Sequence, residues 1–408
     1  MSNFAPVPGW DSRVWLTTEG TYPSNFGTPA TPVAASAREM ISFNLGASEV
    51  GAVRDQKDHN PGRGMRKLFV EGRVGPMPFN GQTSVKSRAA ADTVPQENVI
   101  YQSAGLIETV NSGTSVVYSV GSDPIGSGAF QSMSAYRVLG SAGAAAMEAE
   151  WMRGMVTKAM KFSAADKELL LDFSGAGIGK ANTGVISSVT TDNSQTSINT
   201  ISTEEAYRLN NALNSGFGHL YMQIESEVID ITNVAVATHT ITCTRAALGS
   251  SAASHTAKPL YPYQPALSGY AGSPIPEPVS SVTIDSVALR AMSWEFNLKA
   301  TGLDLLPGET NSKHLQGIKV VRYDAEVSAK LVCHGDDVSL LGKATNRNTV
   351  AWSLVQGGTA GGIVTIAGSY AEVMPITVPD TAGDVSIIDL KLRLRDNTAN
   401  DMFTITYT

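Results

Sequence analysis

An alternation of apolar and polar residues with a period of two runs through most of this chain and constrains its fold more than any other feature. In residues 388–395 every second residue is apolar and the others are charged, and residues 292–298 and 403–408 alternate too. On a β-strand this pattern places one face on a core and the other in polar surroundings. The sequence therefore predicts a mainly β protein with antiparallel sheets. The Asn- and Asp-rich residues 396–401 predict a turn that joins the last two strands as a hairpin.

Helical patterns are few. Residues 94–109 have Pro95 at a permissible first-turn position, which favours a short helix. Residues 203–214 have Thr203 as the expected N-cap and two glutamates in the first turn, which favours a second helix. Residues 144–160 are rich in Ala, Met and Glu, but their apolar spacing leaves helix and strand both open.

Two changes in composition predict the domain organisation. Residues 174–200 are nearly all Gly, Ser, Thr and Asn, and residues 259–279 contain six prolines. We interpret both stretches as flexible joints around an inserted domain. The prediction is a main domain formed by residues 1–180 and 279–408, with a small β-rich domain inserted at residues 181–278.

The charge of the chain argues against a protein that grips phosphates. The net charge is −7, and charged residues form 16% of the chain against roughly 25% in a typical soluble domain. A surface with little charge suits packing against other subunits, because few charges must be desolvated there. Cys243 and Cys333 are ninety residues apart, and we expect both to be unpaired, buried side chains.

Targeting and membrane signals are not expected to be present. The first 15 residues lack a basic region followed by an apolar run, so we predict no secretory signal. No stretch approaches the 18 consecutive apolar residues of a spanning helix. We therefore expect synthesis in a cytoplasm and no membrane partner.

The sequence patterns of catalytic and cofactor sites are missing. The Gly-rich segment 175–180 lacks the residues that a phosphate-binding loop needs at positions 174 and 181, so we interpret it as a linker. The six histidines show no helical metal-site spacing, and residues 334–337 read as a turn after a strand over 327–333. No nucleophile elbow occurs. We predict no catalytic, cofactor-binding or metal site, and no enzyme.

One charged segment, residues 54–67, has almost no apolar content and is expected to be an exposed loop. It is either a solvated loop or a contact arm whose charges set the register against a neighbouring molecule. The candidate contact residues are Arg54, Lys57, Asp58, His59, Arg63, Arg66 and Lys67.

The order of these features resembles the tail tube proteins of siphophages, the long-tailed bacteriophages. The resemblance covers about 300 residues and rests on order and spacing without an invariant motif. It is carried by residues 64–73, 76–79, 83–86, 94–109, 112–119, 148–156, 161–164, 171–175 and 281–408.

The inserted segment is similar to a small barrel-like motif of phage structural proteins. Residues 227–231, 241–250 and His255 follow its order of an Arg-Gly pair, then Gly-Thr, then His and Gly. This chain departs from the motif at Ala246, Ser250 and Ala257, which puts any ligand role of the motif in doubt.

The resemblance implies a structural virion protein with a β-sandwich or barrel fold, a flanking helix and an outward-projecting insertion. Six subunits would form a ring, and stacked rings would form a tube through which DNA passes without specific binding. The implied partners are further copies of the chain and the tape measure, terminator and distal tail proteins, and no cofactor is implied. The location would be the virion tail, and the loop at 54–67 becomes the candidate contact between rings.

An alternative is a β-sandwich binding module, such as a carbohydrate-recognising decoration or adhesin domain. Tyr261, Tyr263 and Tyr270 lie among the prolines and would form its exposed aromatic cluster. The other interpretation of these tyrosines is that they are apolar anchors that hold the linker on the main domain.

Overall fold

The structure, a computed structural model, describes most of the chain. The described residues are 12–21, 27–46, 53–55, 68–70, 76–121, 130–140, 147–164, 168–199, 201–214, 217–267, 272–276, 280–289, 291–301, 304–307, 315–319, 322–332, 349–376, 380–382, 385–396 and 401–408.

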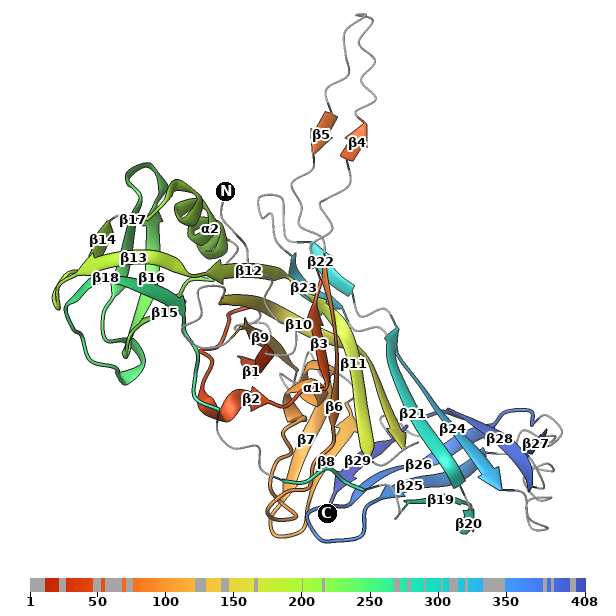
Figure 1. Ribbon diagram of the computed structural model, residues 1–408. Coiled ribbons are helices and arrows are strands. Elements are labelled where there is room, and N and C mark those ends of the chain that lie inside the picture. The colour runs from red at the N-terminus through yellow and green to blue at the C-terminus, as the bar shows by residue number, and fades with distance from the viewer. Residues whose placement is uncertain are drawn as a thin grey trace, which may run out of the picture.

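The main body consists of two layers of antiparallel strands around one core (Figure 1). The first layer runs in the order β3 (Ser42–Leu45), β6 (Met77–Ser84), β11 (Leu169–Gly177), β10 (Glu148–Ala164), β21 (Ala291–Thr301), β24 (Arg322–Val332) and β28 (Val385–Leu394). The second runs in the order β7 (Leu106–Asn111), β8 (Ser115–Val120), β29 (Thr404–Tyr407), β26 (Val364–Val373), β25 (Thr349–Gln356), β19 (Ser280–Ile284) and β20 (Val287–Leu289). Strand β28 also pairs with β26, so the layers join into a barrel-like sheet.

The long strand β10 extends beyond the first layer and organises a second group of strands. Its first half pairs with β12 (Gly179–Gly184) on one side and β9 (Gln131–Leu139) on the other. Strand β9 pairs with β1 (Ser12–Thr21), which pairs with β2 (Ala37–Arg38). The predicted mainly β, antiparallel fold is therefore confirmed.

The period-two pattern corresponds to burial in the strands that predicted it. In β28, Ile388, Leu390, Leu392 and Leu394 are buried, and the charged residues between them are exposed. The buried faces of the two layers meet in aromatic contacts, such as the edge-to-face contact of Phe296 and Phe403 at 4.9 Å between ring centroids.

The predicted C-terminal hairpin is wrong. Strand β29 pairs with β26 and β8, whereas β28 pairs with β24, β26 and β27 (Asp380–Ala382). Residues 364–367 of β26 contact β29, and residues 371–373 contact β28. The last two strands therefore lie one after the other along the same edge of β26, because β8 occupies the other edge of β29.

The helices are shorter or fewer than the patterns allow. Within the segment 94–109 only α1 (Asn98–Ser103) is helical, because Gly105 adopts φ 83° and β7 begins at the next residue. The segment 144–160 lies largely in strand β10. The helix predicted at 203–214 is α2 (Thr203–Asn214), but its cap is Ser202, whose hydroxyl accepts from Glu205 N–H at 3.1 Å.

The stretch predicted as a flexible linker, residues 174–200, is mostly strand. It contains the end of β11, all of β12, β13 (Ile186–Thr191) and β14 (Ser197–Asn199). Its small residues are required by close packing, since a Cβ on Gly175 would lie 1.9 Å from the Val156 carbonyl oxygen. Glycine here indicates a tight strand contact rather than a joint.

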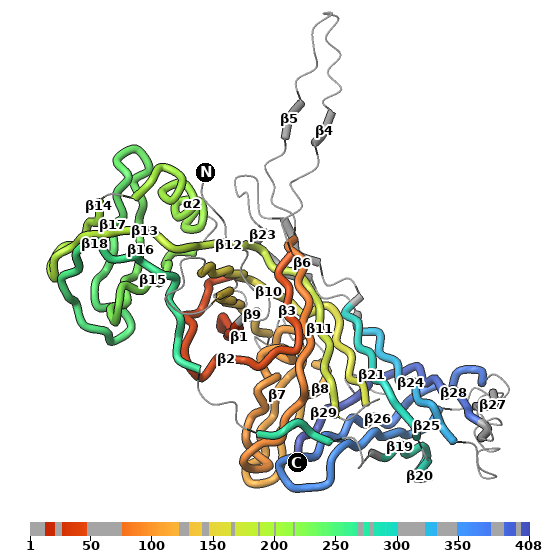
Figure 2. The backbone as a smooth tube through the Cα atoms, viewed as in Figure 1, coloured from red at the N-terminus to blue at the C-terminus, as the bar shows by residue number. Residues whose placement is uncertain are grey.

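A separate six-stranded antiparallel sheet follows β12 and forms the green lobe in Figure 2. Its order is β13, β18 (His255–Pro262), β15 (Leu220–Ile224), β16 (Glu227–Ala235), β17 (Thr240–Thr244) and β14. Helix α2 packs on it. The sheet lies within residues 181–278, although the proposed domain boundaries themselves stay a prediction.

The lobe shares a hydrophobic core with the main body, so its junction is packed. Trp151 of β10 lies between Tyr136 of β9, at 4.3 Å between ring centroids, and Phe217 of the lobe, at 6.0 Å. Trp15 is fully buried beside Tyr136.

Short elements complete the described chain. Strand β4 (Val53–Asp55) pairs with β5 (Leu68–Val70), and β22 (Asp304–Pro307) with β23 (Leu315–Lys319). Single 3-10 turns occur at Ala34–Ser36, Val236–Thr238 and Ala247–Gly249. No helix among the described residues is long and apolar enough to cross a membrane.

Candidate functional site

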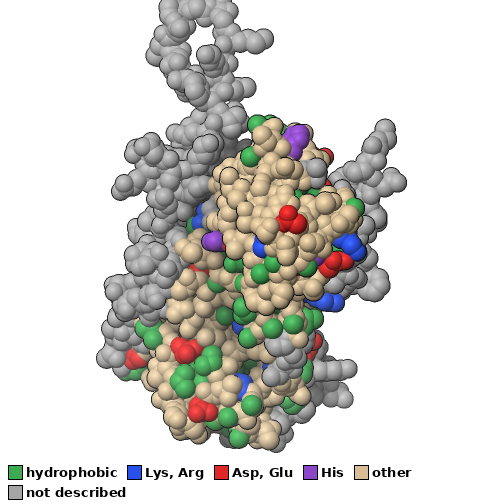
Figure 3. Space-filling view, turned by 90° about the vertical axis from the view of Figure 1, so that its left-hand side faces the viewer, with side chains coloured by type: hydrophobic (Ala, Val, Ile, Leu, Met, Phe, Trp, Pro, Cys, Tyr) green, Lys and Arg blue, Asp and Glu red, His purple; other side chains and the backbone are tan. Residues whose placement is uncertain are grey.

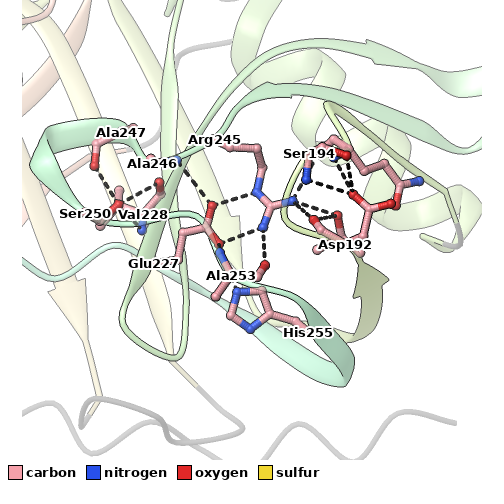
Figure 4. A network of polar contacts seen from close by, with 12 residues as sticks. Asp192, Ser194, Glu227, Val228, Arg245, Ala246, Ala247, Ser250, Ala253 and His255 are labelled. Atoms are coloured by element: carbon pink, nitrogen blue, oxygen red, sulfur yellow. Dashed lines mark hydrogen bonds and ion pairs between the residues drawn. The ribbon is translucent and has the colours of Figure 1, made fainter.

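A buried carboxylate, Glu227, is the centre of an extensive polar network in the six-stranded sheet (Figure 4). It begins β16, and its Oε1 accepts from Arg245 Nε at 2.6 Å and from the Ala246 N–H at 3.2 Å. Its Oε2 accepts from Arg245 Nη2 at 2.7 Å and from the Ala253 N–H at 3.0 Å, and it lies 2.9 Å from His255 Nε2. A buried carboxylate is tolerated when this many donors surround it.

Arg245, at the end of the β16–β17 hairpin, connects three segments of the lobe. Its Nη1 donates to the Thr191 hydroxyl at 2.8 Å and to the carbonyl oxygens of Asp192 and Gln195. Its Nη2 donates to the Ala253 carbonyl oxygen at 2.6 Å. The guanidinium therefore holds the loop after β13 against the segment that leads into β18.

His255 extends the network toward the surface. Its Nε2 faces Glu227, and its Nδ1 lies 2.9 Å from Glu225 Oε2, so both ring nitrogens face carboxylate oxygens. Glu225 Oε1 also forms an ion pair with Lys258 Nζ at 2.6 Å. Acidic and basic groups thus alternate from the buried centre to the surface.

The hydrogen bonds set the charge state of this centre. Burial raises the pKa of Glu227, but the bonds from Arg245, Ala253, His255 and Ala246 outweigh burial and lower that pKa to about 2. The bond to Glu227 raises the pKa of Arg245. The carboxylate and the guanidinium are therefore both charged throughout the neutral range.

Two of the three residues that depart from the phage-like pattern have an unusual backbone. Ala246 adopts φ 54° and Ala257 φ 52°, the left-handed region where glycine has no steric penalty. The Ser250 hydroxyl accepts from the Val228 N–H at 2.9 Å and donates to the Ala247 carbonyl oxygen at 2.9 Å, a task that threonine would also perform.

The hydrogen bonds of this network connect distant segments of the lobe. The Ser250 hydroxyl is bonded to backbone groups, and no bond joins it to His255 within the described residues. Burial raises the pKa of the Cys243 thiol to about 11, which keeps the thiol protonated. The described residues contain no group of three His, Cys, Asp or Glu side chains able to hold a metal ion.

A second buried carboxylate, Glu19 of β1, supports the main body. It accepts from the N–H groups of Gly154 at 2.7 Å and Gly27 at 2.9 Å and from the Ser132 hydroxyl at 2.6 Å. Arg153 donates to the Gly27 carbonyl oxygen at 2.7 Å beside it. Burial dominates and raises the pKa of Glu19 to about 8, although the hydrogen bonds and Arg153 oppose this shift. The sequence analysis did not identify Glu19, because no recognised motif surrounds it.

The predicted contact loop is only partly described. Arg54 lies in β4, where its backbone pairs with Phe69 of β5. The remaining candidates fall outside the described residues, namely Lys57, Asp58, His59, Arg63, Arg66 and Lys67.

The other residues singled out from the sequence are partly placed. Cys243 is buried and unpaired, as expected, whereas Cys333 and residues 334–337 lie outside the described residues. Tyr261 packs against the second core, and the Tyr263 carbonyl oxygen accepts from the Tyr136 hydroxyl. Both are anchors of their segment, and Tyr270 lies outside the described part.

The outward face of the first layer carries balanced charges across its strands. Opposite charges stand directly across neighbouring strands, where they attract one another. The cross-strand pairs are Lys161 with Asp172, Lys299 with Asp324, Glu326 with Arg393 and Lys330 with Asp389. Shorter polar groups extend this face toward β3, where Gln82 donates to Asp172 at 2.7 Å.

No protein-family model matches the chain, and no curated protein matches its sequence.

Proposed function

We propose that this chain is the tube-forming subunit of a long-tailed bacteriophage tail, a structural protein without catalytic activity. Hexameric rings of the subunit stack into the conduit for the genome. Support comes from the resemblance in sequence order together with the two-layer antiparallel sandwich. The same resemblance supplies the proposed location in the virion tail and the proposed tape measure, terminator and distal tail partners.

The observation that carries the proposal is the broad outward face of β6, β11, β10, β21, β24 and β28. Four of its cations stand opposite carboxylates in the cross-strand register, as in the pair of Lys330 and Asp389. Binding of DNA depends on unmatched cations that neutralise phosphates and release counterions. A face with matched charges gives a polyanion no such grip and lets it slide.

The low charge of the rest of the surface supports assembly. Charged side chains are scattered over the face shown in Figure 3, and most of that face is neutral. Neutral polar surface and small side chains are buried between subunits at little desolvation cost.

The test is negative-stain electron microscopy of the purified full-length protein at low and high concentration. Rings that stack into hollow tubes of uniform width are expected, with their number rising with concentration. A protein that stays monomeric at every concentration, even after the addition of virion partners, contradicts the tube proposal. That outcome favours the alternative, a monomeric binding module.

A further inference from the structure

A cavity of about 410 Å³ opens where the six-stranded lobe meets the main body. Its volume lies within the range of about 300–1,000 Å³ that is usual for small-ligand sites. Strands β15 and β18, with Glu225 and Gln264 just after them, supply most of its lining, and Met147, just before β10, adds the contribution of the main body. The cavity is separate from the outward face that we assign to the conduit.

One wall of the cavity is rigid and apolar. Tyr261 lies opposite Gln223 in the β15–β18 register and packs partly against the second core. Pro259 and Pro262 flank it on the same strand, and Met147 is buried beneath. An aromatic ring that packs partly against a core has little entropy left to lose on binding.

Two glutamine side chains, Gln223 and Gln264, line this cavity with their amide groups. Gln223 donates one N–H to the Glu225 carbonyl oxygen at 2.8 Å and keeps its amide oxygen as an acceptor. Gln264 accepts from the Arg13 guanidinium, and in this amide orientation both its oxygen and its NH₂ group are satisfied within the protein. The Gln223 oxygen is therefore the acceptor beside Tyr261, and a purely apolar ligand would leave it unsatisfied.

The charges at the mouth of the cavity are already paired. Glu225 and Lys258 form an ion pair at 2.6 Å, and each is about half exposed. Glu225 also contacts His255, which connects the mouth to the buried network. A charged ligand finds no unmatched partner in this pair, so the chemistry favours a neutral ligand with many hydroxyl groups.

We propose that this cavity binds a neutral saccharide. The Tyr261 ring packs against the C–H face of one sugar ring, while the Gln223 oxygen accepts from its hydroxyl groups. A ligand of this size in a half-open site has a Kd on the order of 1 mM. The site would add recognition of a cell-surface glycan to a tail whose tube role does not require it.

The experiment uses full-length protein and saturation-transfer NMR with glucose, N-acetylglucosamine, maltose and cellobiose as probes, followed by titration of the strongest. Binding of at least one probe is expected, with a loss of about tenfold or more in Tyr261→Ala. Gln223→Ala removes the acceptor, leaves the core intact and is expected to weaken binding as well. Tyr207→Ala is the matched control, because this tyrosine of α2 is 55% exposed and lies outside the cavity.

Three outcomes overturn the proposal. The first is the absence of saturation transfer to every probe at 10-millimolar concentration, and the second is equal binding by wild type, Tyr261→Ala and Gln223→Ala. The third is binding of inorganic phosphate at the same place in preference to all four sugars. None of these outcomes depends on whether the protein forms tubes, so the two proposals fail separately.

Discussion

At the scale of single residues, the lobe depends on a charge placed where water cannot reach it. Glu227 is fully buried, and its stability contribution comes from five contacts that segments far apart in sequence supply. Removing one partner of such a group leaves the others unsatisfied, which is more harmful than losing a surface ion pair.

Acidification is expected to weaken the lobe through this carboxylate. The folded-state pKa of Glu227 is about 2, below the ordinary value of 4.5, so its contribution is fully present above pH 4.5 and is lost as the pH falls toward 2. Glu227→Gln should lower the unfolding free energy at pH 7 by about 3–5 kcal/mol. Urea unfolding followed by circular dichroism at several pH values checks this prediction. Below pH 4.5 the unfolding free energy of Glu227→Gln should depend less on pH than that of the wild type.

The matched control is Glu326→Gln on the exposed face of β24, where a change within about 0.5 kcal/mol is expected. An equal effect of the two substitutions would contradict the role of Glu227.

Two alanines with left-handed backbones are expected to be improved by glycine. Ala246→Gly and Ala257→Gly should each raise the unfolding free energy by about 1 kcal/mol, because the Cβ penalty at φ 54° and 52° disappears. Thermal unfolding measures the change. Ala212→Gly in α2 is the opposite control and should lower stability by about 1 kcal/mol. Destabilisation by all three would show that the left-handed positions carry no strain.

At the scale of elements, the pairing of β10 with β11 and β12 depends on glycines that allow neighbouring side chains and backbone to approach closely. A Cβ on Gly154 would lie 2.4 Å from Ile178, and a Cβ on Gly177 would lie 2.7 Å from Met152. These contacts explain why a stretch rich in Gly and Ser forms strands here. The neighbouring side chains fill the space that a larger residue would need.

Gly175→Ala should be strongly destabilising. The new Cβ would lie 1.9 Å from the Val156 carbonyl oxygen and 2.7 Å from the Phe79 ring, so β10 and β11 must separate. A loss of about 3 kcal/mol or more is expected, at the upper end of overpacking effects. Denaturant unfolding measures it against Gly218→Ala, whose Cβ meets nothing within 4 Å and should change stability by less than about 0.5 kcal/mol. Similar midpoints for both variants would contradict the packing explanation.

At the scale of the whole molecule, the lobe and the main body share one of two hydrophobic cores. Phe217 and Leu220 of the lobe belong to the same buried cluster as Trp15, Tyr136 and Trp151 of the main body. Unfolding the lobe alone would expose these aromatic side chains to water. The two parts are therefore coupled in stability.

Calorimetry should show a single unfolding transition for the full chain. Phe217→Ala should lower the unfolding free energy by about 3–5 kcal/mol and shift that transition as a whole, because the ring is fully buried beside Trp151. Tyr207→Ala, on the exposed side of α2, should leave the transition in place. Two separate transitions, only one of them moved by Phe217→Ala, would show that the lobe unfolds independently.

The amino-acid sequence by itself determined the local properties of the chain. The period-two pattern of residues 388–395 identified the buried face of β28. The glutamates after Thr203 identified α2 with its bounds, although its cap is Ser202 and not Thr203. These are short-range properties, because a strand or helix exposes one face according to the order of neighbouring residues. The absence of a recognised catalytic pattern was likewise read from short segments and stays a prediction.

Only the tertiary structure decided which segments meet. It placed β28 and β29 along one edge of β26 in place of a hairpin, and it turned residues 174–200 from an expected joint into strands. It also brought Glu227, Arg245 and His255 together with backbone groups of the segments that lead away from β13 and toward β18. Strand pairing and buried ion pairs depend on the packing of segments that are distant in the sequence. A glycine serves a close strand contact as well as a turn, and the neighbouring residues in the sequence do not distinguish these two roles.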